Sequence, residues 1–347
     1  MKRISASSTA TQREKGAMTA VNALRWILMA AAVLTALKPV PVHAQLFSLA
    51  IDPVTPTTLY AGTQGVWKST DGGATWNITG LKDREQYSLA IDPVTPMTVY
   101  SGRSGAIARS TDGGVSWTSV AIVGDPYGLS IDPSLPTTLY AKVSRPGGYT
   151  VLKSTNSGSS WSETPPSIHL TINGLAIDDL RPTNLYAMAS DPRVAGADCC
   201  IVYKSTDGGA IWTARGNVMA NAFLVTDPVT PATLYAGGDL GIFKSIDDGS
   251  NWVPAGPAAH ALVIDPLNPA TLYATRTDYN CFEFWGDFHC LVTGVIYRST
   301  DAATNWTQVA ELADIPVYPV VIDPLTPTTL YAGGWKSTDG GATWTAR

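Results

Sequence analysis

The sequence predicts an all-β protein, a seven-bladed β-propeller whose blades each contain four antiparallel strands. Two repeated motifs carry this prediction. Ser-x-Asp-x-Gly-x-x-Trp recurs along the chain, and Ile-Asp-Pro-x-x-Pro-x-Thr-Leu-Tyr, in more or less complete form, precedes each copy. The 302 residues from Leu46 to Arg347 divide into seven units of about 43 residues, which is the size of one four-stranded propeller blade.

The Ser-x-Asp motif, called the box below, is intact in five units. These copies are Ser69 to Trp76, Ser110 to Trp117, Ser205 to Trp212, Ser245 to Trp252 and Ser337 to Trp344. Two copies are degenerate, because Ser154 to Trp161 has Asn156 in place of Asp and Ser299 to Trp306 has Ala303 in place of Gly. The tyrosine that ends the other motif is present in all seven units: Tyr60, Tyr100, Tyr140, Tyr186, Tyr235, Tyr273 and Tyr331. The phase of the repeat is therefore constant along the chain.

The first unit shows how a blade is built. Its strands are predicted at Phe47 to Ile51, Thr58 to Gly62, Val66 to Ser69 and Thr75 to Ile78. The segment between the first two strands contains two prolines, which cannot donate within a sheet ladder, so it is a turn. Dividing the chain by the two repeated motifs predicts blades at about 46–85, 86–125, 126–171, 172–220, 221–258, 259–316 and 317–347. Because units and blades coincide, we expect blade packing alone to close the ring, with no hydrogen bond across the seam.

The box residues are expected to act locally. The acidic side chain accepts hydrogen bonds from turn amides, the serine pairs with nearby backbone, the glycine permits a positive φ, and the tryptophan fills space. This structural role is predicted for Asp71, Asp112, Asn156, Asp207, Asp247, Asp301 and Asp339, and for the buried, equivalent Trp76, Trp117, Trp161, Trp212, Trp252, Trp306 and Trp344. The basic residues before the box serines are expected at exposed strand positions: Lys68, Arg109, Lys153, Lys204, Lys244, Arg298 and Lys336.

The box resembles the Asp-box, or bacterial neuraminidase repeat (BNR). The whole unit resembles the repeats of exported Asp-box propellers, a group that includes sialidases, xyloglucanases, sortilin-type receptors and photosystem II stability factors. The resemblance runs from residue 45 to the end and is specific for the blade, so it implies no single activity. It does imply that the box joins the third and fourth strands on the side of the ring away from the functional face.

Residues 1–44 are predicted to be a signal peptide. The twelve-residue apolar run from Trp26 to Leu37 follows basic residues and is too short to span a bilayer. Val42-His43-Ala44 suits cleavage before Gln45, and Met18 is an alternative start that gives a leader of more usual length. We expect an exported protein, periplasmic or extracellular, with no stable membrane span after cleavage. An uncleaved anchor is the alternative.

The net charge and the cysteine content limit which partners, disulfides and metal sites are expected. The first 44 residues hold six of the 23 Lys and Arg but one of the 28 Asp and Glu, so the remainder is acidic and nucleic acid is excluded as a partner. A disulfide is predicted between Cys281 and Cys290, while the pairing of Cys199 and Cys200 stays open. No Cys/His cluster has zinc spacing, so neither a metal site nor a cofactor is expected.

The candidate ligand site lies where the repeat is interrupted. The connections between second and third strands are long in blades 3, 4 and 6 (142–149, 190–200 and 275–294) and project from the face opposite the boxes. The blade 6 segment gathers aromatic side chains beside carboxylates, which suits stacking on a sugar or contact with a protein. The alternative is a small satellite core held by the disulfide. Candidate binding residues are Arg145, Tyr149, Arg193, Arg276, Tyr279, Glu283, Trp285, Asp287 and His289.

The favoured function is that of a monomeric, non-catalytic exported propeller that binds a protein or a glycan through these three connections. A xyloglucanase-like glycoside hydrolase is the alternative. It would need two carboxylates about 5 to 10 Å apart on the same face, such as Glu283 or Asp287 opposite Asp191 or Asp198. A sialidase is disfavoured, because no Arg-Ile-Pro motif precedes the first blade and the chain after the leader has only four glutamates.

Overall fold

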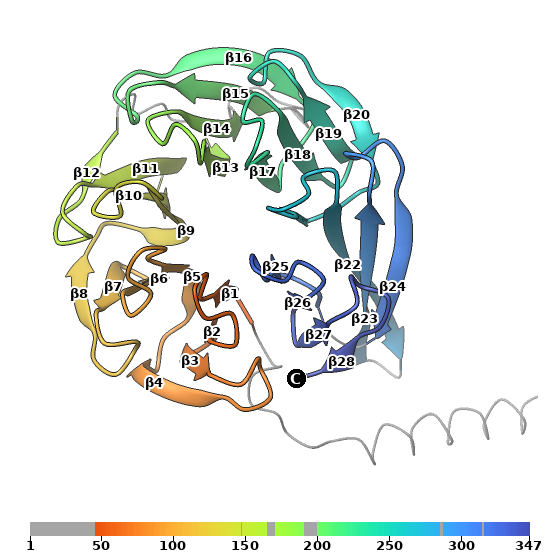
Figure 1. Ribbon diagram of the computed structural model, residues 1–347, viewed down its shortest axis with the longest axis horizontal. Helices are drawn as coiled ribbons and strands as arrows, with labels where there is room; N and C mark the ends of the chain where they lie inside the picture. The colour runs from red at the N-terminus through yellow and green to blue at the C-terminus, as the bar shows by residue number, and fades with distance from the viewer. Residues whose placement is uncertain (1–45, 147, 165–170, 191–199, 285–286, 314–315) are drawn as a thin grey trace, which may run out of the picture. The chain divides into compact units, whose positions relative to one another are not determined.

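A computed structural model describes residues 46–146, 148–164, 171–190, 200–284, 287–313 and 316–347, with only the backbone for 282–284 and 287–289. Seven antiparallel sheets of four strands each form a ring (Figure 1). The predicted seven-bladed β-propeller is therefore confirmed, and the described residues include no helix. No helix in this part of the chain is long and apolar enough to cross a membrane.

Each blade contains four strands that are consecutive in sequence and hydrogen-bonded in order, so no strand is exchanged between blades. Blades 1 to 4 contain β1 (Ser48–Ile51), β2 (Leu59–Gly62), β3 (Gly65–Ser69), β4 (Asn77–Lys82); β5 (Gln86–Ile91), β6 (Val99–Arg103), β7 (Ala106–Ser110), β8 (Thr118–Ala121); β9 (Asp125–Ile131), β10 (Leu139–Arg145), β11 (Gly148–Ser154), β12 (Ser162–Glu163); β13 (Thr171–Ile177), β14 (Leu185–Ser190), β15 (Cys200–Ser205) and β16 (Thr213–Val218). Blades 5 to 7 contain β17 (Phe223–Thr226), β18 (Leu234–Gly238), β19 (Gly241–Ser245), β20 (Val253–Gly256); β21 (Ala261–Ile264), β22 (Leu272–Phe284), β23 (Asp287–Ser299), β24 (Thr307–Ala313); β25 (Val320–Ile322), β26 (Leu330–Ala332), β27 (Trp335–Ser337) and β28 (Thr345–Ala346).

The first strand of each blade is the innermost one (Figure 1). It leads into a turn fixed by the aspartate of the Ile-Asp-Pro motif. In blade 1 the buried Asp52 accepts hydrogen bonds from the amides of Val54 and Thr55, both at 2.9 Å. These bonds satisfy turn amides where the prolines interrupt the ladder. The same side-chain contacts recur at Asp92, Asp132, Asp178, Asp227, Asp265 and Asp323.

The box is a closed set of local hydrogen bonds. The Ser69 hydroxyl donates to Asp71 at 2.8 Å and accepts from the Gly73 amide at 2.9 Å, while Asp71 accepts from the Thr75 amide at 2.9 Å. Hydrogen bonds from Thr75 and Ser69 lower the pKa of Asp71 to about 2. Because the acceptors of this carboxylate are already engaged within its own turn, it has a local task that explains its recurrence.

The box tryptophans occupy equivalent positions but are only half-buried in all seven blades, so the expectation of full burial was wrong. Each tryptophan comes directly before the outermost strand of its blade. At this position one side of the indole faces solvent. In blade 1 the Trp76 indole donates to the Gly73 carbonyl at 3.1 Å. Trp306 differs, because its indole donates to the Ala255 carbonyl of the preceding blade at 2.7 Å.

The apolar core lies between neighbouring blades. Tyr60, Val66 and Leu81 of blade 1 pack with Val99 and Ala108 of blade 2 in one cluster. A cluster of the same kind joins the last blade to the first, where Tyr331 packs against blade 1. Burial between neighbouring blades explains why all four residues of the second strand of blade 1, Leu59 to Gly62, are buried.

A polar contact made by the motif tyrosine and the basic residue before the box also joins adjacent blades. The Tyr60 hydroxyl and the Lys68 ammonium both donate to the Gly113 carbonyl of blade 2, at 3.1 and 3.0 Å. The ammonium also lies 5.2 Å from the centre of the Tyr60 ring. The pairs Tyr140 with Lys153, Tyr235 with Lys244 and Tyr331 with Lys336 repeat this contact. In the two blades with arginine, Arg109 and Arg298 lie over Tyr100 and Tyr273 at 5.9 and 5.7 Å.

Two expectations are overturned by this contact. The basic residues before the boxes were predicted at exposed positions, yet the five lysines are half-buried or buried and donate to the next blade. The seam was predicted to have no hydrogen bond, yet Tyr331 and Lys336 of blade 7 donate to the Gly72 carbonyl of blade 1 at 3.3 and 3.1 Å. A repeat motif that contacts the next repeat makes the same bond where the ring closes.

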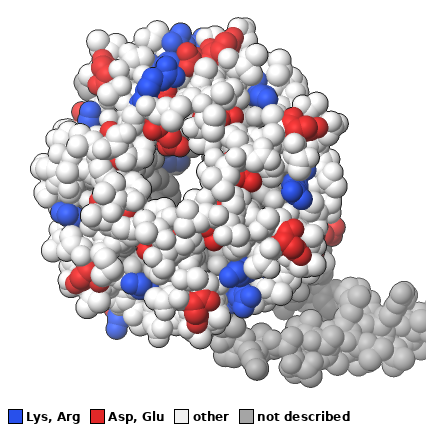
Figure 2. Space-filling view, in the orientation of Figure 1, with Lys and Arg blue, Asp and Glu red and all other residues white. Residues whose placement is uncertain are grey.

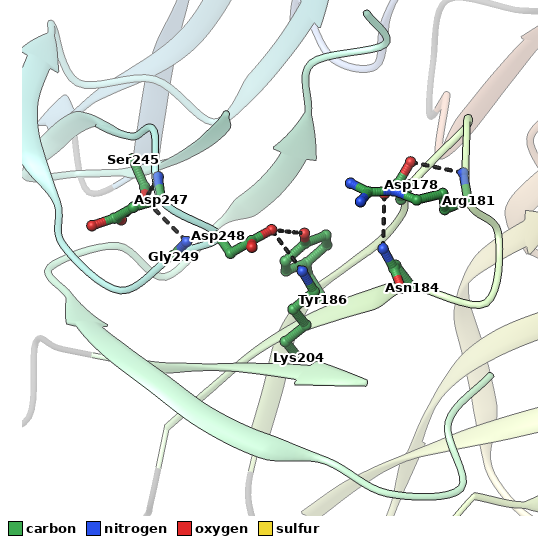
Figure 3. Close-up of polar contacts among 9 residues, drawn as sticks. All are labelled: Asp178, Arg181, Asn184, Tyr186, Lys204, Ser245, Asp247, Asp248 and Gly249. Carbon is green, nitrogen blue, oxygen red and sulfur yellow. Dashed lines mark hydrogen bonds and ion pairs between the residues drawn. The ribbon is translucent and has the colours of Figure 1, made fainter. Parts of the chain in front are cut away.

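The interface between blades 4 and 5 replaces the carbonyl with a carboxylate (Figure 3). Asp248 stands where most boxes have glycine, and its backbone φ is +60°. Its side chain accepts from the Tyr186 hydroxyl at 2.5 Å and from Lys204 at 2.7 Å. Burial opposes its ionisation, but the hydrogen bonds from Lys204 and Tyr186 outweigh burial and lower the pKa of Asp248. This is a partly buried ion pair, whereas the other interfaces with a lysine join its ammonium to an uncharged carbonyl.

Candidate functional site

The blade 6 insertion, expected as a long connection, is a continuous two-stranded hairpin. β22 and β23 pair over thirteen positions, from Leu272 opposite Ser299 to Phe284 opposite Asp287. β21 pairs with β22 only as far as Thr275, and β24 pairs with β23 only as far as Thr293. The end of the hairpin therefore extends beyond the blade; residues 276–284 and 287–292 are called the arm below. The predicted disulfide between Cys281 and Cys290 joins its two strands.

Aromatic residues gather at the base of the arm. The position four residues before the motif isoleucine is the start of the innermost strand in each blade. It holds Phe47, Tyr87, Tyr127, Asn173, Ala222, His260 and Tyr318 in chain order. Because first strands start at the end of the blade from which the arm extends, these residues encircle one end of the ring. Tyr318, Phe47, Tyr87 and Tyr127 come from consecutive blades 7, 1, 2 and 3, and we call these four the aromatic collar.

Three of the collar residues contact one another, and the fourth contacts the arm. The rings of Tyr87 and Tyr127 lie 4.8 Å apart, and Phe47 contacts Tyr87 edge-on at 5.9 Å. The Tyr318 hydroxyl lies 3.3 Å from that of Tyr279 on the arm. Tyr127, Tyr318 and Tyr279 are 43%, 39% and 52% exposed. Exposed aromatic side chains that already touch one another form a ready surface for a ligand.

β-bulges set the orientation of two collar residues. In β5 the register with β6 shifts between Gln86 and Ser88, so Tyr87 has no partner, and in β9 Tyr127 is skipped in the same way. Asn173 is the skipped residue in blade 4. An extra residue in one strand turns its side chain out of the regular alternation, and such bulges are frequent beside functional sites. Three successive blades therefore displace the same position at the inner rim.

Carboxylates flank the collar. Glu85 accepts a hydrogen bond from the Tyr87 hydroxyl at 2.9 Å, and this bond with burial raises the pKa of Tyr87 to about 12. Burial raises the pKa of Tyr127, with Asp125 adding to it. Both phenols are neutral near pH 7 and present flat faces with hydroxyl groups. A sugar ring, an apolar side chain or a cationic side chain can stack on such faces.

A half-buried lysine, Lys142, borders the collar at blade 3. Lys142 donates to the Asn173 carbonyl of blade 4 at 3.0 Å, and its ammonium lies 5.8 Å from the centre of the Tyr149 ring. Burial lowers the pKa of Lys142. Lys142 thus joins blade 3 to blade 4. Its ammonium also lies against Tyr149, one of the predicted binding residues, and Tyr149 therefore lies next to the collar.

The other predicted site residues are distributed as follows. Arg145 forms an ion pair with Glu163 and donates to the Val123 carbonyl, and Arg276 forms an ion pair with Asp278 at 2.7 Å. Tyr279 reaches the collar through Tyr318. Arg193, Trp285 and the side chains of Glu283, Asp287 and His289 lie outside the described residues, as do Asp191 and Asp198 of the predicted carboxylate pair. Cys200 is buried, and Cys199 lies outside the described residues.

The collar was missed by sequence reasoning, which followed the insertions instead of the repeat. Aligning the seven units would have shown aromatic residues at one column, four residues before the motif isoleucine. On the face shown in Figure 2, Lys, Arg, Asp and Glu are scattered around the central opening. Among the described residues, no group of three His, Cys, Asp or Glu side chains is arranged to hold a metal.

Comparison with known proteins places the fold among solved propellers. No family model and no curated protein matches the sequence. Similar solved structures include YCF48 bound to D1 peptide, at 14% identity and a TM-score of 0.57, with 87% of this chain and 91% of that one covered. An ancestral GH74 enzyme has 16% identity and a TM-score of 0.56, with 88% and 49% covered. The GH74 xyloglucanase from Xanthomonas campestris has 19% identity and a TM-score of 0.51, with 88% and 58% covered.

These likenesses agree with the resemblance found in the sequence and define the class of protein as a seven-bladed propeller. At such identities they show the fold alone. The chain spans about half to three-fifths of the length of the two GH74 structures. Both an enzyme and a peptide-bound protein therefore share this scaffold, and the activity must be argued from the site.

Proposed function

We propose that this protein is an exported, non-catalytic binding protein that takes a protein or glycan partner on the aromatic collar and the adjoining arm. The observation that supports this most strongly is the run of collar residues in four consecutive blades, two of them displaced by bulges. The propeller fold does not require an aromatic residue at that position, since Ala222 occupies it in blade 5. The disulfide in the arm is compatible with export.

The same contacts argue against nucleophilic catalysis at the collar. Tyr87 and Glu85 form a hydrogen-bonded pair of the residue types that a sialidase uses. However, the pKa of Tyr87 is raised to about 12, so the phenol is not poised to lose its proton near neutral pH. A hydrolase would instead need an acid and a second carboxylate at a fixed separation. The tyrosine here is better suited to stacking and to donating a hydrogen bond.

A binding screen tests the proposal. The mature protein is applied to a glycan array and to a displayed library of twelve-residue peptides, beside the variant Tyr87→Ala/Tyr127→Ala. We expect hits with the native protein that the variant loses, because the variant removes the stacked pair. Release of reducing sugar from xyloglucan is measured in parallel, and turnover abolished by Glu283→Gln or Asp287→Asn would favour the hydrolase instead.

A further inference from the structure

The arm carries an open strand edge that faces the centre of the ring. β21 lies inside β22 in blade 6, and it ends where β22 continues. The Thr275 carbonyl accepts from the His260 amide at 2.7 Å, and the Thr277 amide donates to the His260 imidazole at 3.4 Å. Odd-numbered residues of β22 therefore direct their backbone groups toward the inner side. The next in this series are Tyr279 and Cys281.

Within the described part of the chain, the backbone of Tyr279 and Cys281 makes no hydrogen bond to any strand other than β23. β23 cannot supply a hydrogen bond to these two residues, because it bonds to the even-numbered residues of β22. Among the described residues, an amide and a carbonyl at strand spacing thus have no protein partner. An edge of this kind is what an added β-strand requires.

Three features suit this edge to an extended chain lying over the collar. The Tyr279 hydroxyl lies 3.3 Å from that of Tyr318, so the edge lies beside the collar residue of blade 7. The disulfide between Cys281 and Cys290 fixes the strand register before any ligand arrives. Glu85 and Asp125 lie beside the stacked tyrosines and raise the pKa of those phenols, so the surface favours cationic side chains.

Building on the proposed function, we propose that an extended polypeptide segment of a partner adds as a strand to the inner edge of β22, with basic side chains stacked on the aromatic collar. The backbone edge decides between the two partner classes. A polypeptide alternates donors and acceptors at the spacing that Tyr279 and Cys281 offer, whereas a glycan has no such repeat. Specificity then comes from those ligand side chains that contact the collar.

The test uses peptides selected from a displayed twelve-residue library against the mature protein and then synthesised. Tyr279→Pro removes the inward amide, and Tyr279→Ala removes the same side chain but keeps the amide. We expect Tyr279→Pro to bind the selected peptide about tenfold more weakly than Tyr279→Ala, the loss of one backbone hydrogen bond. Melting temperatures of both variants show whether the ring is folded.

A ligand-side arm keeps the test independent of protein folding. The selected peptide is methylated on its backbone nitrogens, one position at a time. Strand addition predicts that alternate positions lose binding and the positions between them retain it. Uniform tolerance of methylation, equal affinity of the proline and alanine variants, or enrichment of no peptide would each overturn the inference. If Tyr87→Ala/Tyr127→Ala abolishes binding while the proline variant does not, the proposed function stands and strand addition falls.

Discussion

The Tyr331 hydroxyl of the last blade donates to the Gly72 carbonyl of the first, across 259 positions of sequence. The contact is the same one that Tyr60 makes with Gly113 inside the ring. Closure by strand exchange is therefore unnecessary, because the last and first blades carry the two halves of this contact: Tyr331 and Lys336 on one side and the Gly72 carbonyl on the other. The ring closes with the same chemistry that propagates it.

This equivalence predicts equal losses at the seam and inside the ring. Tyr331→Phe and Tyr60→Phe each remove one buried donor, and each is expected to lower the free energy of unfolding by about 1 kcal/mol. Urea unfolding of both variants measures this. The equivalence would be wrong if the seam variant lost several times more stability than the internal one, since the seam would then be a weak point after all.

Acid sensitivity is predicted at the interface of blades 4 and 5. The pKa of Asp248 is lowered from its ordinary value of 3.8. Its ion pair therefore stabilises the folded protein above that pH, and the contribution disappears as the pH falls through the lowered pKa. Asp248→Asn should flatten the loss of stability below pH 4 relative to the native protein. Thermal melts between pH 2 and 6 measure it.

A double-mutant cycle with Lys204→Met separates this pair from the box carboxylates, whose pKa values are also low. A coupling energy that does not change between pH 6 and pH 2 would contradict the assignment.

The degenerate box of blade 6 offers a stabilising substitution. Ala302 and Ala303 have φ angles of +56° and +70°, where each of the other six boxes has glycine in at least one of the two positions. Left-handed backbone costs a residue with a Cβ atom about 1 to 2 kcal/mol. Ala303→Gly should therefore raise stability by about 1 kcal/mol. Ala342→Gly, in a box turn position without positive φ, is the matched control and should not. Equal effects would show that no strain resides at Ala303.

Removal of the disulfide should act locally. Cys281 and Cys290 are nine residues apart and lie opposite each other in paired strands, so the bond constrains the arm and not the ring. Cys281→Ser/Cys290→Ser is expected to leave the melting temperature of the ring within a few degrees, because the arm can open without the blades. Amide hydrogen exchange at the even-numbered residues of the arm in β22, such as Asn280, should become faster, because these amides bond to β23. A large loss of ring stability would show that the arm is part of the core.

The fold could be predicted because repetition multiplies weak local signals: a turn with two prolines and a box with a glycine each occur in six of the seven units. The contact of Lys68 and its equivalents with the next blade could not be predicted. An alternating strand pattern does not indicate which long side chain reaches a neighbouring blade. The collar could be predicted only in part. Aromatic residues at one column of the repeat are visible in sequence, but the bulges that displace Tyr87 and Tyr127 depend on register with the next strand.

The central claim is that the ligand face is the collar end of the ring and not the box end. Its most direct test is the dissociation constant of a glycan or peptide found in the screen, measured with two double variants. Tyr87→Ala/Tyr127→Ala alters the collar, and Val115→Ala/Ile211→Ala alters exposed apolar residues of two boxes. The account predicts at least a tenfold weaker Kd for the collar variant, from loss of stacking, and an unchanged Kd for the box variant. The reverse pattern, with both variants folded, would contradict it.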